Sequence, residues 1–267
     1  MSGGAERMQA LIATATGPAK KATPKQSLHS QARASHGLTL VEVAIFLLLL
    51  GLLMMGVLRA EQLIENARVR KAIAQQDAVE QAVLAFEDRF HALPGDYDRA
   101  SEYIDCSGST CLNGNGNGRV EPGTGGAIHE EILVWHQLSA AGLLLDHYEM
   151  SNPSDASPTP SNTPVNAFGG YLQFAFDSNW GISTNTAQRH NLKTGNHVAA
   201  AVLAGIDHKI DDGLPGSGRF QFSTYAGAGT PPAVGGTASG CTDADSSAGR
   251  WLERDGSDNC GASILLR

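Results

Sequence analysis

The sequence predicts an α+β protein in which one long N-terminal helix is followed by a small head with an antiparallel β-sheet. Three observations carry this prediction. No proline occurs from Leu38 to His91, and apolar residues recur there at helical spacing. The triplet Pro94-Gly95-Asp96 then stops the helix, and short segments with strand-like alternation follow it. The 267 residues, 42% of them apolar, suffice for one domain of ordinary size plus an N-terminal anchor.

Residues 1–37 are rich in Ala, Ser, Thr, Gln and Lys without sustained periodicity, and we interpret them as a disordered leader. Five basic residues stand there against one acidic residue, a net charge of +4. The chain as a whole carries −8, so the remainder carries −12. A basic flank before an apolar segment predicts that the leader stays cytoplasmic and the C-terminal part crosses the membrane. A remainder at −12 argues against nucleic acid as a partner.

Residues 38–58 form an apolar stretch in which only Thr39 and Glu42 are polar. It is long enough to span a bilayer, which takes about 20 helical residues. No small-residue cleavage site follows it, so the anchor is expected to be retained. Residues 59–93 are expected to continue the helix beyond the membrane. The C-terminal half of their alanine stripe is expected to pack under the head and the N-terminal half between neighbouring subunits: Ala67, Ala74, Ala78 and Ala82.

The head is expected to cover residues 94–267. Residues 101–127 and 150–165 have loop composition. The regular elements expected in the head are helices over 128–145 and 198–210, and strands over 171–176, 219–223 and 263–267.

Four cysteines in a translocated head indicate disulfides, and four cysteines allow three pairings. We expect the local pairing, Cys106–Cys111 with Cys241–Cys260. The alternative is four reduced, structural cysteines. Neither C-x-x-C nor a His/Cys zinc spacing occurs.

The segment 113–121 reproduces the early spacing of a calcium loop, with oxygen-bearing side chains at alternate positions before a glycine and an apolar residue. Two interpretations stay open: a glycine-rich turn held by Cys106–Cys111, or a structural calcium site. Position twelve of the template is Thr124, so the loop is not an intact EF-hand. The candidate ligands are Asn113, Asn115, Asn117 and Glu121, with further charge from Asp105, Glu130 or Glu131.

Other polar groups point to structure rather than catalysis. Asp211-Asp212-Gly213 is typical of a helix end and turn, although these aspartates and Asp207 have the composition of a cation site. The histidines, His136 among them, show no metal-ligand spacing and are expected in surface or loop positions. No nucleophile-elbow, phosphate-loop or H-E-x-x-H motif occurs, so we expect no enzymatic activity and no cofactor other than the calcium ion considered above.

The run Gly37-Leu-Thr-Leu-Val-Glu42 and the apolar stretch after it resemble the processing motif of the type IV pilin and type II secretion pseudopilin superfamily. Phe90–Asp96 and Ile206–Gly213 also resemble segments of pilin-like proteins. The resemblance implies a pilin-like fold, cleavage after Gly37 by a prepilin peptidase/methylase, and N-methylation of Leu38. It also implies a single-pass location in the bacterial inner membrane with a periplasmic head, and assembly with other pilin or pseudopilin subunits into a filament.

The charge of Glu42 supports this resemblance on physical grounds. Cleavage would leave an amine on Leu38, four residues from Glu42, and unpaired charges are costly at the edge of a bilayer. Pairing Glu42 with the amine of a neighbouring subunit would offset that cost; the alternative is that its carboxylate only reaches the headgroups. The competing function is a periplasmic binding or enzymatic domain on an uncleaved anchor. The sequence does not separate a pilus subunit from a secretion pseudopilin.

Overall fold

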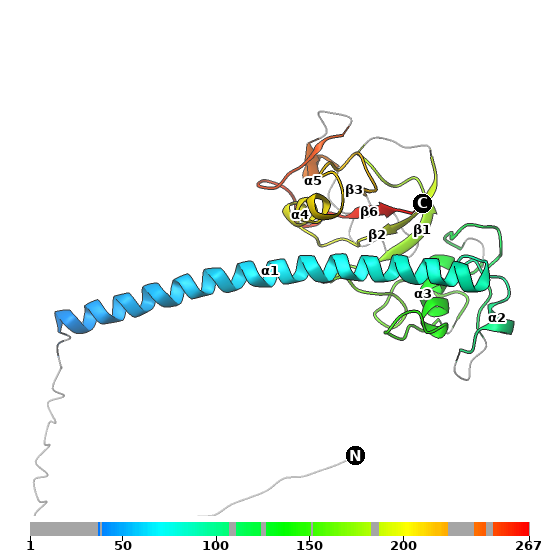
Figure 1. The fold of residues 1–267 in the computed structure, drawn as a ribbon, viewed down its shortest axis with the longest axis horizontal. Coiled ribbons are helices and arrows are strands. Elements are labelled where there is room, and N and C mark those ends of the chain that lie inside the picture. The colour runs from blue at the N-terminus through cyan, green and yellow to red at the C-terminus, as the bar shows by residue number, and fades with distance from the viewer. Residues whose placement is uncertain are drawn as a thin grey trace, which may run out of the picture. The chain divides into compact units, whose positions relative to one another are not determined.

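The computed structural model describes residues 37, 39–106, 111–123, 127–150, 152–182, 187–223, 238–243 and 248–266 (Figure 1). The chain divides into two compact units, Met1–Leu52 and Leu53–Arg267. The elements in chain order are α1 (Leu40–Phe90), α2 (Ala100–Tyr103), α3 (Glu130–Ala140), β1 (Gln173–Asp177), β2 (Arg189–Lys193), α4 (Ala200–Ile210), β3 (Phe220–Phe222), α5 (Ala238–Cys241), β4 (Thr242–Asp243), β5 (Arg250–Trp251) and β6 (Ala262–Leu265). The predicted α+β class is therefore present, as a long N-terminal helix and a small antiparallel sheet.

Helix α1 has nearly the predicted bounds, and its end has a clear local cause. His91 and Gly95 adopt positive φ angles of 52° and 90°, and Pro94 between them cannot continue a helix. The side-chain oxygen of Gln137 accepts a hydrogen bond of 2.6 Å from the backbone N–H of Gly95. Added at Gly95, a Cβ atom would lie 2.7 Å from the carbonyl oxygen of Glu130, so the turn packs closely on α3.

The sheet of the head has four antiparallel strands in the order β1-β2-β6-β3 (Figure 1). The predicted strands over 171–176, 219–223 and 263–267 correspond to β1, β3 and β6. Strand β2 was not predicted, although it is the second strand of the sheet. A separate two-stranded sheet pairs β4 with β5.

Within the Leu53–Arg267 unit, α1 contributes to two apolar clusters. Val79, Val83 and Phe86 pack with Trp135 of α3 and Phe174 of β1.

The second cluster lies closer to the start of α1 and uses Val69 and Ala72. They pack with Leu203 of α4 and with Phe220 and Phe222 of β3. The buried residues of α1 recur three or four positions apart, which places them on one helix face: Val69, Ala72, Gln76, Val79, Val83 and Phe86.

The alanine stripe does not form that face, apart from Ala82. Ala67, Ala74 and Ala78 are exposed. The expectation that the C-terminal half of the stripe packs under the head is therefore wrong at Ala78 and confirmed at Ala82. The reason is that the larger side chains Val79, Val83 and Phe86 select the face that turns inward. The side chains of Ala67, Ala74 and Ala78 are therefore free to contact another molecule.

Both predicted disulfides are present. Cys106 and Cys111 have Cα atoms 5.4 Å apart, and Cys241 and Cys260 have Cα atoms 5.8 Å apart. The second bond joins the end of α5 to the residues before β6, and its two cysteines are fully buried. The alternative of four reduced cysteines is therefore not what the structure shows.

Candidate functional site

Helix α1 begins at Leu40, three residues after Gly37. The hydroxyl oxygen of Thr39 accepts a hydrogen bond of 3.2 Å from the backbone N–H of Glu42, and its carbonyl oxygen accepts one of 3.1 Å from Val43. Threonine followed three residues later by glutamate is the pattern of a capping box. Glu42 lies in the first turn, where the helix dipole favours a negative charge.

Gly37 itself is exposed, and the fold does not require a glycine at this position. A Cβ atom added to Gly37 would meet nothing within 4 Å, and its φ angle is outside the left-handed region. The described residues therefore give no steric reason for a glycine at this position. The predicted methylation site, Leu38, lies outside the described residues.

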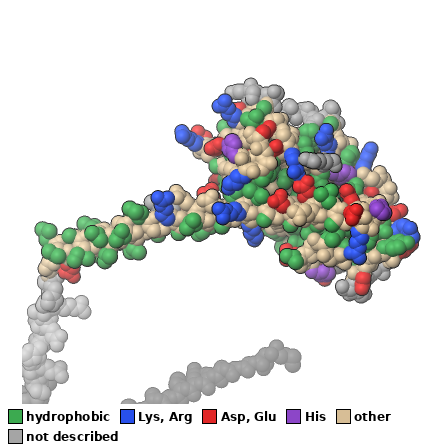
Figure 2. Space-filling model, viewed as in Figure 1, with side chains coloured by type: hydrophobic (Ala, Val, Ile, Leu, Met, Phe, Trp, Pro, Cys, Tyr) green, Lys and Arg blue, Asp and Glu red, His purple; other side chains and the backbone are tan. Residues whose placement is uncertain are grey.

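The apolar side chains that follow are exposed, with fractional exposures from 39% to 86% (Figure 2). Fourteen large ones lie between Leu40 and Val57: Leu40, Val41, Val43, Ile45, Phe46, Leu47, Leu48, Leu49, Leu50, Leu52, Leu53, Met54, Met55 and Val57. At ~1.5–3 kcal/mol for each fully buried side chain, covering the part left exposed is worth about 10–25 kcal/mol. Helix α1 contains a window of mean hydropathy 2.7 and is long and apolar enough to cross a membrane. These properties are consistent with a single-pass membrane anchor near the N-terminus.

The asparagine loop is folded around Asp96. The two carboxylate oxygens of Asp96 accept hydrogen bonds from the backbone N–H groups of Asn117 (2.9 Å) and Gly118 (2.8 Å). Gly114 lies so close to the backbone of Asp96 that a Cβ atom would not fit there. Asp96 was predicted only as part of the triplet that stops α1, so this second role is an addition from the structure.

The predicted calcium ligands use their oxygen atoms within the loop. Side-chain oxygens of Asn113, Asn115 and Asn117 accept hydrogen bonds from the backbone N–H groups of Ser101, Asn117 and Arg119, at 2.8, 2.9 and 2.8 Å. The carboxylate of Glu121 accepts a bond of 3.2 Å from the Asn117 amide. These bonds favour the glycine-rich turn, and the calcium site stays a prediction.

Two buried acids at the start of α3 lie beside this loop. The carboxylate of Glu130 accepts hydrogen bonds from the backbone N–H groups of Asn115 (2.9 Å) and Glu121 (3.2 Å). Burial nevertheless raises the pKa of Glu130 to about 7. Burial also raises the pKa of Glu131 to about 8, and one of its oxygens has no hydrogen-bond partner among the described residues. Its other oxygen lies 3.4 Å from Nδ1 of His129.

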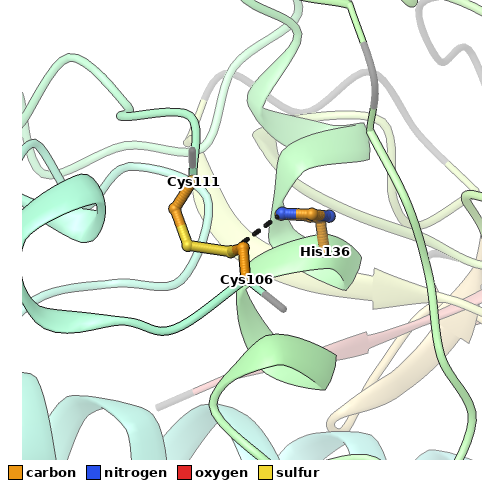
Figure 3. A group of neighbouring side chains, drawn as sticks. All are labelled: Cys106, Cys111 and His136. Atoms are coloured by element: carbon orange, nitrogen blue, oxygen red, sulfur yellow. Dashed lines mark hydrogen bonds between the residues drawn. A yellow bond between two sulfur atoms is a disulfide. The ribbon is translucent and has the colours of Figure 1, made fainter. Parts of the chain in front are cut away.

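His136 is buried on α3, so its expected surface or loop position is wrong. Figure 3 shows it beside the Cys106–Cys111 disulfide, with Nε2 3.1 Å from the sulfur of Cys106. Its Nδ1 lies 3.1 Å from the carbonyl oxygen of Tyr148. The two sulfur atoms bond one another, so this cluster is a disulfide with a histidine neighbour. No sequence spacing signals it, because 25 residues separate Cys111 from His136.

Asp211 and Asp212 directly follow α4, so this helix ends where predicted, whereas Asp207 lies within its last turn. The carboxylate of Asp207 accepts hydrogen bonds from the backbone N–H of Gly213 (3.1 Å) and from the indole N–H of Trp251 (2.7 Å). Asp211 accepts one from the backbone N–H of Phe220 at 2.7 Å. The interactions of these groups are therefore those of a helix end that holds β3 and β5 in place.

Comparisons of this chain with family models, with curated proteins and with solved structures found no match. The fold and the N-terminal segment therefore define a general class of protein, an α+β head with a candidate membrane anchor. A finer assignment depends on the residues at the start of α1.

Proposed function

We propose that this chain is a structural subunit of a filament that assembles from an inner membrane. More particularly, we propose a pilin or pseudopilin of a type IV pilus or type II secretion pseudopilus, with a pilin-like fold. A prepilin peptidase would cleave it after Gly37 and methylate Leu38. In the membrane, the leader would be cytoplasmic and the head periplasmic.

The observation that carries the proposal is the coincidence of three features within one short segment. Gly37 is exposed and unconstrained by the described residues, Glu42 lies in the first turn of α1, and a helix segment with exposed apolar side chains follows at once. A simple anchor requires the apolar helix but neither the glycine nor the carboxylate. Recognition of Gly37 by a peptidase supplies a reason for the first, and subunit pairing supplies a reason for the second.

Glu42 would pair with the amine of Leu38 on a neighbouring subunit. Among the residues that the structure describes, the Glu42 carboxylate has no hydrogen bond or ion pair, so it is available for such a partner. An uncompensated charge within a hydrocarbon layer costs roughly 2.5–3.5 kcal/mol at a helix centre. Pairing offsets part of this cost and sets the stagger between adjacent helices. Ala67, Ala74 and Ala78 would then allow close helix contacts further along.

The test is the mass of the N-terminal peptide from the native membrane. We expect a chain that begins at methylated Leu38, and a Gly37→Ala variant that keeps the leader. Gly51→Ala is the matched control, because Gly51 also has open space around it and lies inside the apolar segment. An intact leader on the wild-type chain would contradict the proposal.

The competing function, a periplasmic binding or enzymatic domain on an uncleaved anchor, predicts that intact leader. It also predicts no effect of Glu42 on association between copies. The mass of the N-terminal peptide and the effect of Glu42→Ala on association between copies therefore separate the two functions.

A further inference from the structure

A polar cluster lies between β1 and β2 in the sheet of the head. In the register of this strand pair, Gln173 is opposite Lys193, Ala175 opposite Asn191, and Asp177 opposite Arg189. The alternation of side chains along a strand therefore places Asp177, Asn191 and Lys193 on one face of the sheet. Asn191 and Lys193 have no exposed surface.

The three side chains contact one another in a closed triangle. Nζ of Lys193 donates hydrogen bonds to Oδ2 of Asp177 and to Oδ1 of Asn191, the latter at 2.9 Å. Nδ2 of Asn191 donates to Oδ1 of Asp177 at 2.9 Å. The hydroxyl of Ser263, on β6, donates a fourth hydrogen bond to Oδ1 of Asn191 at 3.2 Å.

A lysine in this position is poised to act as a neutral amine. Burial lowers the pKa of Lys193, and the adjacent Asp177 opposes that effect. Transfer of one proton from Nζ to Asp177 removes both charges and the desolvation cost of the buried ammonium group. A desolvated neutral lysine is a nucleophile, and Asn191 offers a carbonyl carbon next to it.

We propose that Lys193 and Asn191 form an intramolecular isopeptide bond, with Asp177 moving the protons. Nζ of Lys193 attacks Cγ of Asn191, the Nζ–Cγ bond forms, and the Cγ–Nδ2 bond breaks. Nζ gives up two protons in all, the first to Asp177 before attack and the second through Asp177 as the intermediate collapses. The departing amide nitrogen takes up both protons and leaves as ammonium. The balance is one ammonium ion released, one secondary amide formed, and the Asp177 carboxylate regenerated.

Each contact has a role in this reaction. Oδ2 of Asp177 faces the attacking nitrogen and receives its proton, whereas Oδ1 of the same carboxyl group faces the departing nitrogen of Asn191. The contact between Nζ and Oδ1 of Asn191 places the attacking nitrogen beside the amide group. The Ser263 hydroxyl points at the oxygen that becomes negative during attack. Because the groups are held by paired strands, the reaction is intramolecular and requires no enzyme or cofactor.

Peptide mass spectrometry of the full chain tests the bond directly. Trypsin does not cleave after a lysine whose Nζ is acylated, so the denatured and reduced chain should yield one peptide, 190–209, uncut at Lys193. Its mass should be about 17 Da below the sequence mass, the loss of one ammonia. Cleavage at Arg189 and Lys209 serves as the internal control for digestion.

Two variants test the roles of Lys193 and Asp177 in forming the bond. The digest of the wild-type chain shows whether the bond exists even if a variant fails to fold. Lys193→Met and Asp177→Asn should each abolish the mass loss, and Asp177→Asn should also restore cleavage after Lys193. Asp98→Asn, at an exposed acid, should leave the bond in place. A wild-type chain cut at Lys193, with or without a mass loss, overturns the proposal, and so does a link between Lys193 and Asp177. The outcome does not depend on whether the chain assembles into filaments.

Discussion

The buried carboxyl group of Glu131 makes the stability of the head depend on pH. Its pKa rises from the ordinary value of 4.5 to about 8 because burial disfavours the ionised form. Between these values the folded chain keeps a proton that the unfolded chain has released, so the free energy of unfolding falls as pH rises. Below pH 4.5 both states are protonated and Glu131 contributes no pH dependence.

The size of the effect follows from the shift. Each pH unit within the window costs ~1.4 kcal/mol per group, so the decline between pH 4.5 and pH 7 is at most about 3 kcal/mol from Glu131. Local relaxation around a buried carboxylate reduces this figure, and we expect a measured value of about 1–3 kcal/mol. Glu131→Gln keeps the shape of the side chain without the titration. It should therefore be more stable than the wild type at pH 7 and equal to it near pH 4.

Thermal unfolding of the full chain in detergent, followed by tryptophan fluorescence from pH 4 to pH 8, measures this difference. Trp135 is buried on the same helix and reports on this region. Glu149→Gln, at an exposed acid, is the matched control and should behave as the wild type. Parallel pH profiles for Glu131→Gln and the wild type would refute the assignment of the proton to Glu131.

Three further predictions concern the core, the assembly segment and the asparagine loop. Phe86→Ala should destabilise the head by about 3–5 kcal/mol in chemical denaturation, because Phe86 is fully buried, whereas Leu84→Ala, at an exposed position, should cost less than about 0.5 kcal/mol. Glu42→Ala should leave cleavage intact but reduce filament incorporation, measured by shearing and immunoblotting; unchanged incorporation would refute the pairing, and Glu61→Ala is the control. Adding calcium after chelation should leave the melting temperature unchanged, because the oxygens of the loop already accept hydrogen bonds; a rise of several degrees would establish the calcium site.

Local signals in the sequence were sufficient for the features that depend on neighbouring residues. Proline-free helical periodicity predicted α1, and the spacing of the four cysteines predicted both disulfides. The strands β1 and β3 alternate apolar and polar residues, which is why they were predicted. In each case the residues that form the feature lie close together in the chain.

The features missed by the sequence analysis depend on distant parts of the chain. Strand β2 buries the polar side chains of Asn191 and Lys193, so its sequence lacks the alternation of apolar and polar residues that identifies a strand. Their burial is explained only by the hydrogen bonds with Asp177 and Ser263, which are distant in the chain. The second role of Asp96 appears only when residues 114–118 fold back over it. The burial of a polar residue cannot be predicted from its local sequence, because it depends on a hydrogen-bond partner elsewhere in the chain.

The exposed apolar side chains between Leu40 and Val57 limit how this chain can leave a membrane. Exposing them to water costs about 10–25 kcal/mol, which equals or exceeds the ~5–15 kcal/mol that holds an ordinary domain folded. If the chain leaves the membrane for a filament, its helix must therefore pass directly from lipid to the helices of its neighbours. A subunit pulled out alone would collapse or aggregate before it could be added.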